Sequence, residues 1–331
     1  PNVVPSAAGF PAGSIKLQFA APDFHSPYTQ QGTVAIEHQF GRDVAFTASY
    51  IWSRGIGLFT QRDLNLGAGT LENFTVQDAA GNTVNSFASP VYTLPNRVNR
   101  AYSSILQVEN GGQSWYNALA LQLQKRFSRS FQVQFAYTWS HAIDDADQQG
   151  ASWNVSNTFN NATLPGDYRF DKGSSTLDQR HRAIVNWVWE PRLERSNSAF
   201  VKYVINGWQL SAITTLASAQ PVTATMNSVS TSLNGIFPGI QLANSTFNGS
   251  GGWSRVPFLP VGTLDVDQTY NVDARLSHQW PIGERLKLSL GFEAFNVFNT
   301  MHNTSGQTTA YSLAAGGVCK PQLTGGVSVL G

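Results

Sequence analysis

The side chains best able to do chemistry are six histidines, and their spacing argues against a catalytic or metal centre. No two of them stand in an H-x-H or H-E-x-x-H arrangement, the spacings that bring two imidazoles to one metal ion. His181, in the segment 178–182, would need a serine partner to act as a base, and no G-x-S-x-G motif supplies one. We therefore expect Arg180 and His181 to anchor a loop to a strand, and we expect no enzymatic activity.

Three aspartates, Asp144, Asp145 and Asp147, are the only weak candidates for a metal site. They cluster at the end of a predicted strand, where their oxygens could bind Ca²⁺, but no EF-hand spacing follows them. A solvated loop is the expected reading of these residues. The sequence predicts neither a metal nor a cofactor.

Aromatic and amide side chains in two long polar segments are the candidate ligand-binding residues: Trp153, Asn154 and Trp253. Such a surface suits a sugar or a peptide. Long loops are polar whether or not they bind a ligand, so a solvated surface is the alternative.

Composition narrows the class of protein. Only 12% of the residues are charged, against roughly 25% in ordinary soluble domains, while aromatic residues make up 12%. The net charge of +1 provides no field for binding nucleic acid, and the single cysteine, Cys319, excludes an internal disulfide. No run of about 18 apolar residues could form a transmembrane helix.

The elements that must position these residues are strands, most clearly 114–127 and 131–140. Their side chains alternate strictly between large apolar and uncharged polar, a period of two that indicates strands with two different faces. Aromatic residues stand near the ends of the apolar face: Trp115, Phe127, Phe131, Tyr137 and Trp139. The other face consists mostly of amide and hydroxyl side chains, including Gln122, Gln124, Gln132 and Gln134. A soluble sandwich usually carries Lys and Glu on its outer face. The pattern is typical of a membrane β-barrel, with its lipid-facing aromatic girdles and polar lumen.

The lengths of the connections alternate along the chain. Turns near residues 41, 128 and 281 are short and the connection 191–206 is of medium length, whereas long polar segments follow residues 52, 143, 218 and 297. This alternation is typical of an outer-membrane barrel with short periplasmic turns and long extracellular loops. We predict an all-β, antiparallel transmembrane β-barrel, partial, with roughly ten strands, in the bacterial outer membrane.

Seven short segments, in order along the chain, also resemble a known family: residues 26–31, 49–55, 114–119, 137–145, 178–182, 207–211 and 293–299. They are similar to the C-terminal barrel portion of Oar-like TonB-dependent outer-membrane receptors. The resemblance implies uptake of a bulky nutrient, driven by the TonB complex through N-terminal parts that include a plug domain. None of these parts precedes Pro1, so we expect residues 1–331 to be a single barrel region, a fragment with its plug absent.

The expected partners are accordingly outer-membrane lipid, the TonB complex through the missing parts and an unknown nutrient, with no nucleic acid. Two alternatives stay open. One is a small self-closed porin or adhesin-like barrel of about ten strands, and the other is a soluble β-sandwich or propeller-like binding module.

Overall fold

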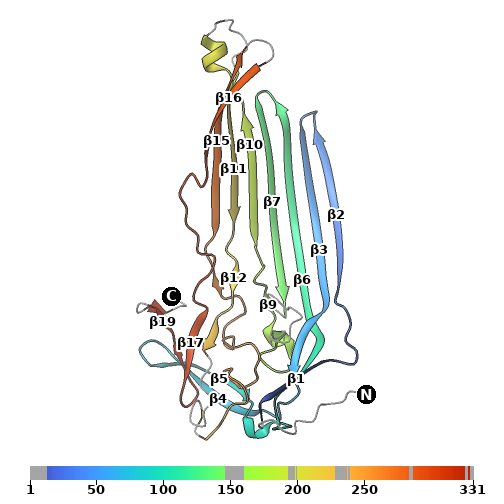
Figure 1. Ribbon diagram of the computed structural model, residues 1–331, viewed down its shortest axis with the longest axis vertical. Helices are drawn as coiled ribbons and strands as arrows, with labels where there is room; N and C mark the ends of the chain where they lie inside the picture. The colour runs from blue at the N-terminus through green and yellow to red at the C-terminus, as the bar shows by residue number, and fades with distance from the viewer. Residues whose placement is uncertain are drawn as a thin grey trace.

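One large antiparallel sheet dominates the computed structural model, which describes residues 13–145, 160–192, 198, 200–227, 237, 239–282, 286–324 and 327–328. Its eight long strands follow the order β16-β15-β11-β10-β7-β6-β3-β2, so each strand lies beside its neighbour in the chain (Figure 1). They are β2 (Tyr28–Phe40), β3 (Val44–Asp63), β6 (Tyr102–Ser128), β7 (Phe131–Asp144), β10 (His181–Trp189), β11 (Trp208–Ala217), β15 (Thr269–Ile282) and β16 (Leu286–Ala294). This confirms the predicted barrel-type sheet.

The long strands number eight, not the expected ten, because two of the ten strands that the sequence predicts, over 14–20 and 322–330, lie outside this path. Residues 14–20 contain β1 (Ile15–Ala20), which pairs in parallel with the first residues of β6, from Tyr102 to Val108. Near the C-terminus, β19 (Leu323–Thr324) and β20 (Val327–Ser328) make a small sheet of their own. Two further short strands, β8 (Asn160–Asn161) and β9 (Gly173–Ser174), pair with β3 and β7.

The register gives the sheet one apolar and one polar face. Val34, Tyr50, Leu119, Trp139 and His181 stand opposite one another across five strands and share the apolar face. Two rows of directly opposed residues illustrate the polar face. One contains Glu37, Thr47, Gln122 and Ala136. The other contains Gln39, Ala45, Gln124, Gln134 and Asn186. Successive side chains of a strand point to opposite sides, so this register fixes the face of every residue in the ladder.

Aromatic residues mark both ends of the apolar face. On β7 and β10, Phe131 lies opposite Trp189 at one end and Trp139 lies opposite His181 at the other. β10 has 9 residues, and a tilted strand needs about 9–11 to cross a bilayer. The apolar belt therefore has the height of a membrane core. Among the described residues, no helix is long and apolar enough to cross a membrane.

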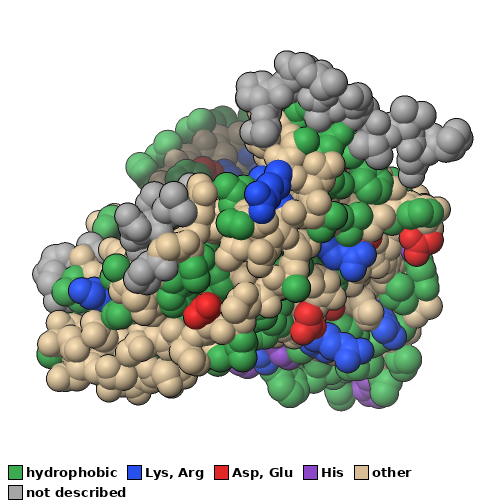
Figure 2. All heavy atoms as spheres, turned by 90° about the horizontal axis from the view of Figure 1, so that it is seen from below, with side chains coloured by type: hydrophobic (Ala, Val, Ile, Leu, Met, Phe, Trp, Pro, Cys, Tyr) green, Lys and Arg blue, Asp and Glu red, His purple; other side chains and the backbone are tan. Residues whose placement is uncertain are grey.

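Short and long connections lie at opposite ends of the sheet, as predicted. The short turns are at the upper end in Figure 1, and the long connections gather at the lower end. Seen from that lower end in Figure 2, most of the described surface is uncharged, with a few Lys, Arg, Asp and Glu side chains scattered over it.

The long connections build a second, five-stranded sheet, which we call the cap sheet. It has the order β13-β17-β18-β4-β5 and combines three connections: β4 (Thr70–Gln77) and β5 (Thr83–Val91), β13 (Thr225–Asn227), and β17 (Thr309–Ala314) with β18 (Val318–Pro321). β12 (Pro221–Val222) pairs with β14 (Leu264–Asp265) beside it. Three short helical turns complete the described elements: η1 (Leu94–Asn96), η2 (Tyr168–Asp171) and η3 (Val201–Ile205).

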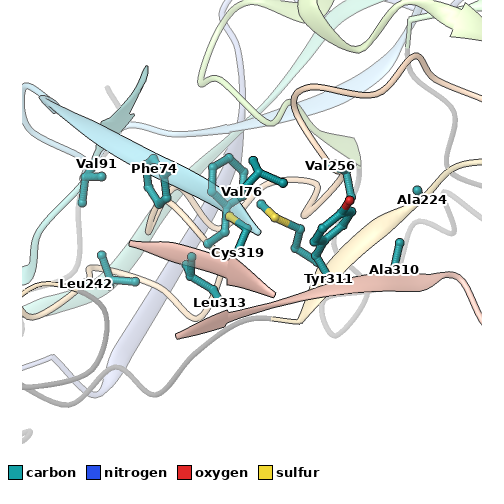
Figure 3. Close-up of a cluster of buried hydrophobic side chains, with 12 residues drawn as sticks. Phe74, Val76, Val91, Ala224, Leu242, Val256, Ala310, Tyr311, Leu313 and Cys319 are labelled. Atoms are coloured by element: carbon teal, nitrogen blue, oxygen red, sulfur yellow. The ribbon is translucent and has the colours of Figure 1, made fainter. Parts of the chain in front are cut away.

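A dry core holds the cap sheet together (Figure 3). Phe74 is fully buried, stacks on Phe87 with ring centroids 4.9 Å apart and meets Phe247 edge-on at 5.8 Å. Cys319 is also fully buried, and burial raises the pKa of its thiol to about 12. The prediction that the long segments after residues 52, 218 and 297 are polar loops was therefore wrong, because together they form a sheet with an apolar core. Its strands are too short for a period of two to stand out, and their partners come from distant parts of the chain.

Candidate functional site

The junction between the main sheet and the long connections is organised by Asp178, which is only 2% exposed. Its carboxylate accepts hydrogen bonds from the backbone N–H of Ala142 (2.8 Å), from His141 Nδ1 (3.0 Å) and from Arg180 Nε (2.8 Å). Arg180 also lies 3.2 Å from His141 Nε2, so the imidazole is held at both nitrogens. The aspartate thus fastens the loop before β10 to the end of β7.

His181 belongs to the same junction and faces the apolar side of the sheet. Its Nδ1 lies 2.7 Å from the Tyr137 hydroxyl, and its backbone N–H donates to Ser218 Oγ at 3.1 Å. These contacts confirm the predicted anchoring role of Arg180 and His181.

A second buried charge pair joins the connection after β7, which contains Asp171, to the connection after β11, which contains Arg255. Arg255 Nε is 2.7 Å from Asp171 Oδ1, and both side chains are about 5% exposed. Arg255 also donates to the carbonyls of Val256 (3.1 Å) and Leu259 (3.2 Å) and stacks on Phe170, with its guanidinium carbon 4.0 Å from the ring centroid. The pair therefore fixes the shape of the turn that begins at Arg255.

These two buried clusters border a cavity of about 560 Å³, which we call the rim cavity. Its lining combines apolar and basic side chains with small residues of β9: His141, Ile143, Phe170, Lys172, Gly173, Ser174, Arg255, Pro257, Phe258, Leu259, Pro260 and Val261. Lys172 is exposed, and its Nζ lies 3.8 Å from the centroid of the Trp115 ring. The volume is in the range of small-molecule sites.

The polar face of the main sheet has a cavity of its own, of about 410 Å³, which we call the wall cavity. Polar side chains that line the wall cavity include Gln132, Gln134, Asn186 and Ser211. Arg275 and Glu293, also in the lining, form an ion pair at 3.2 Å. Asp273 accepts from Asn271 Nδ2 at 3.0 Å and from the N–H of Asn296 at 2.8 Å. The charged side chains that line the wall cavity are thus paired or hydrogen-bonded, as expected for a lumen lining.

Few of the residues selected from sequence meet in one place. Trp153, Asn154 and Asp147 lie outside the described residues. The backbone carbonyl of Trp253 accepts a hydrogen bond from Thr163 Oγ1 at 2.9 Å, next to the rim cavity's Arg255 turn.

Asp145 is only 7% exposed, and its carboxylate accepts the Gln113 N–H at 2.6 Å. Burial raises its pKa. Neither Asp145 nor its neighbour Asp144 belongs to a group of three potential metal ligands among the described residues.

Sequence reasoning missed Lys172, Arg255 and Asp171. Each is a single charged residue in a long connection, with no motif around it. Only the contacts across the chain single them out, since Asp171 and Arg255 come from different connections.

Comparison with known proteins places this geometry in a family. A model described as an outer membrane beta barrel domain matches residues 1–323. The chain belongs to this outer-membrane β-barrel family. It is therefore a protein of the bacterial outer membrane, and the soluble-sandwich alternative is excluded. In such barrels the long loops face outward, so the cap sheet and the rim cavity are on the extracellular side.

Among solved structures, the outer membrane transporter YddB from Escherichia coli aligns with a TM-score of 0.47 and 12% identity. The alignment covers 88% of this chain and 31% of YddB, so the chain spans less than a third of that protein. No curated protein sequence matches the chain.

Proposed function

We propose that this chain forms part of the wall and the extracellular cap of a TonB-dependent receptor-type transporter for a bulky nutrient. The membership in an outer-membrane barrel family and the seven ordered segments that resemble Oar-like receptors support the proposal. The plug and the segment that meets the TonB complex would come from other parts of the transporter.

One observation carries the proposal: both edges of the main sheet are unpaired. In the part of the chain that the structure describes, β2 pairs only with β3, and β16 pairs only with β15. All 13 residues of β2 are exposed. In lipid each unpaired backbone N–H or C=O costs several kcal/mol, so an open sheet edge does not persist in a membrane. In a membrane the β2 and β16 edges must therefore be paired, in our proposal with further strands of a larger wall.

The faces of the sheet fit such a larger wall. The polar face lines the lumen with amides, hydroxyls and the Arg275–Glu293 pair, and the wall cavity lies on that side. The cap sheet places the long connections at the extracellular mouth, where a nutrient would first bind. Trp153, Asn154 and Trp253 stay the proposed ligand contacts in these connections, and catalysis is not part of the proposal.

The rival proposal, a small self-closed porin or adhesin, has one observation in its favour: eight strands are enough to close a narrow barrel. It requires β2 to pair with β16. A cross-linking experiment separates the two proposals, because the native Cys319 is buried and its thiol pKa is raised to about 12, so it does not interfere.

The experiment places one cysteine on β2, Ile36→Cys, and a second in turn at each outward position of β16: Leu286, Leu288, Leu290 and Phe292. The control pairs Ile36→Cys with Ala48→Cys, which are direct partners in the β2–β3 register. In outer membranes the control pair should form a disulfide under mild oxidation, and no β16 position should do so within one chain. An intramolecular β2–β16 disulfide, together with ion conductance in planar bilayers, would establish the self-closed barrel instead.

A further inference from the structure

The rim cavity lies on the outward side of the barrel wall. His141 and Ile143 follow Trp139 on β7 at intervals of two residues, so all three share the apolar, lipid-facing side. The partners of His141 and Ile143 on β6 are Asn117 and Trp115. His141 is about 7 Å beyond Trp139 along the strand. The cavity therefore begins directly above the extracellular aromatic row, at the height of lipid headgroups.

The walls of the cavity are held in place without a ligand. Arg255 is saturated by Asp171 and by backbone carbonyls, which fixes the turn that leads into the apolar segment 257–261. Gly173 faces this segment so closely that an added Cβ would lie 2.2 Å from Val261 Cβ. The apolar half of the cavity is thus preformed and bordered by backbone that cannot move closer.

The charges around the cavity favour an anion. Of the nearby carboxylates, Asp145, Asp171 and Asp178 are each at most 7% exposed and accept hydrogen bonds from N–H groups. Asp144, opposite Gly173 in the β7–β9 pairing, is half-buried, but it belongs to the other side of β7 from His141 and Ile143. The cations are exposed: Lys172 is open to solvent, and the side chain of Arg180 is 47% exposed while it borders His141. An approaching ligand meets positive charge first and apolar surface beside it.

We infer that the rim cavity binds the headgroup of a phosphorylated, acylated lipid of the outer leaflet. Lys172, in the lining of the cavity, supplies charge for the phosphate, and the segment 257–261 with Phe170 supplies apolar surface for the lipid body. Arg180 is not part of the lining, but it contacts His141 there and adds positive charge at its edge, although its Nε is paired with Asp178. A transported nutrient fits the position less well, because a ligand on the outward side of the wall has no access to the lumen. The inference uses only the membrane location and is independent of the proposed transport.

The test uses the full chain, extracted from outer membranes in mild detergent and titrated with diphosphoryl lipid A in native mass spectrometry. The wild type should bind one lipid tightly, and the same lipid without its phosphates at least tenfold more weakly. A basic residue at a membrane surface contributes about 1 kcal/mol, so Lys172→Gln should weaken binding about fivefold. Lys172→Arg should bind as the wild type does. Lys320→Gln is the matched control, since Lys320 is an exposed lysine of the cap sheet.

Three results would overturn the inference. Equal binding by Lys172→Gln and the wild type would show that the cavity plays no part. Equal binding of the dephosphorylated lipid would mean association through the apolar belt alone. Competition by inorganic phosphate at the same concentration as the lipid would indicate a site for free anions.

Discussion

Loss of the Arg255 side chain should destabilise the cap region, by which we mean the cap sheet together with the long connections around it. The loss leaves the buried carboxylate of Asp171 without its charged partner. Arg255→Met keeps the volume and the apolar contacts but removes the partner of Asp171, which is 3% exposed. The carbonyls of Phe170, Val256 and Leu259 lose a donor as well. Breaking a buried ion pair on one side costs roughly 3–5 kcal/mol, so we expect a loss of about 4 kcal/mol in the free energy of unfolding of this region.

The loss should depend on pH with a definite sign. Burial already raises the pKa of Asp171 above the ordinary value of 3.8, although hydrogen bonds from Thr163 and the charge of Arg255 oppose this rise, so loss of Arg255 should raise the folded-state pKa further. A carboxyl with a raised folded pKa favours folding below its unfolded pKa, and this contribution disappears as pH rises through the folded pKa. Stability of the variant should therefore recover as pH falls from 7 toward 4. Adding Asp171→Asn should restore part of it at neutral pH, because no buried charge is left.

Pulse proteolysis in urea, read on fragments from the cap region, measures this stability while the membrane strands stay protected. Arg192→Met is the control, because Arg192 is 60% exposed in its 3.2 Å pair with the half-buried Glu190 and surface pairs contribute about 0–1 kcal/mol. A loss below about 1 kcal/mol for Arg255→Met, or a loss that does not change between pH 7 and pH 4, would refute the reasoning.

Three further predictions concern the extracellular side of the protein. Phe74→Ala should destabilise the cap by roughly 3–5 kcal/mol because it opens a cavity in a fully buried core, while Val84→Ala, at a side chain 60% exposed, should have little effect in the same proteolysis assay. Burial raises the pKa of Asp145, at the extracellular end of the main sheet, so its charged form opposes folding at neutral pH. The melting temperature of the protein should therefore rise as pH falls toward 3.8, and Asp145→Asn should reduce this pH dependence. The Cys319 thiol, with its pKa raised to about 12, should resist maleimide at pH 7.5 in the folded protein and react in urea; fast labelling without urea would show that the core is open.

The hairpins of the main sheet could be predicted from sequence because their signal is local and long. In residues 114–144, alternation over both strands indicates which face each residue occupies, and the observed register agrees with it from Ser114–Asp144 to Lys125–Val133. The register shift between Lys125 and Ser128, next to the turn, was not predicted. The anchoring segment 178–182 was also predictable, although the central role of Asp178 was not. An aspartate in a loop has no signature until its three donors are known.

The cap sheet and the rim cavity could not be predicted, because their determinants are distant in sequence. Val76 meets Cys319, and Arg255 meets Asp171, only after the long connections fold together. The strands of the cap sheet do not carry a clear period of two, and the apolar residues of each connection are too few to indicate a core alone. Local pattern reasoning detects long strands and misses cores assembled from several loops.

The pairing of β4 with β18 has a consequence for the order of folding. β4 follows β3, near one edge of the main sheet, whereas β18 follows β16 at the other edge, and most of the chain separates them. Contacts of such high sequence separation form slowly, because a long loop must close before any of them is made. The cap can therefore assemble only after the last membrane strand has been placed. Until then the three connections stay without the shared core that buries Phe74 and Cys319 in the finished protein.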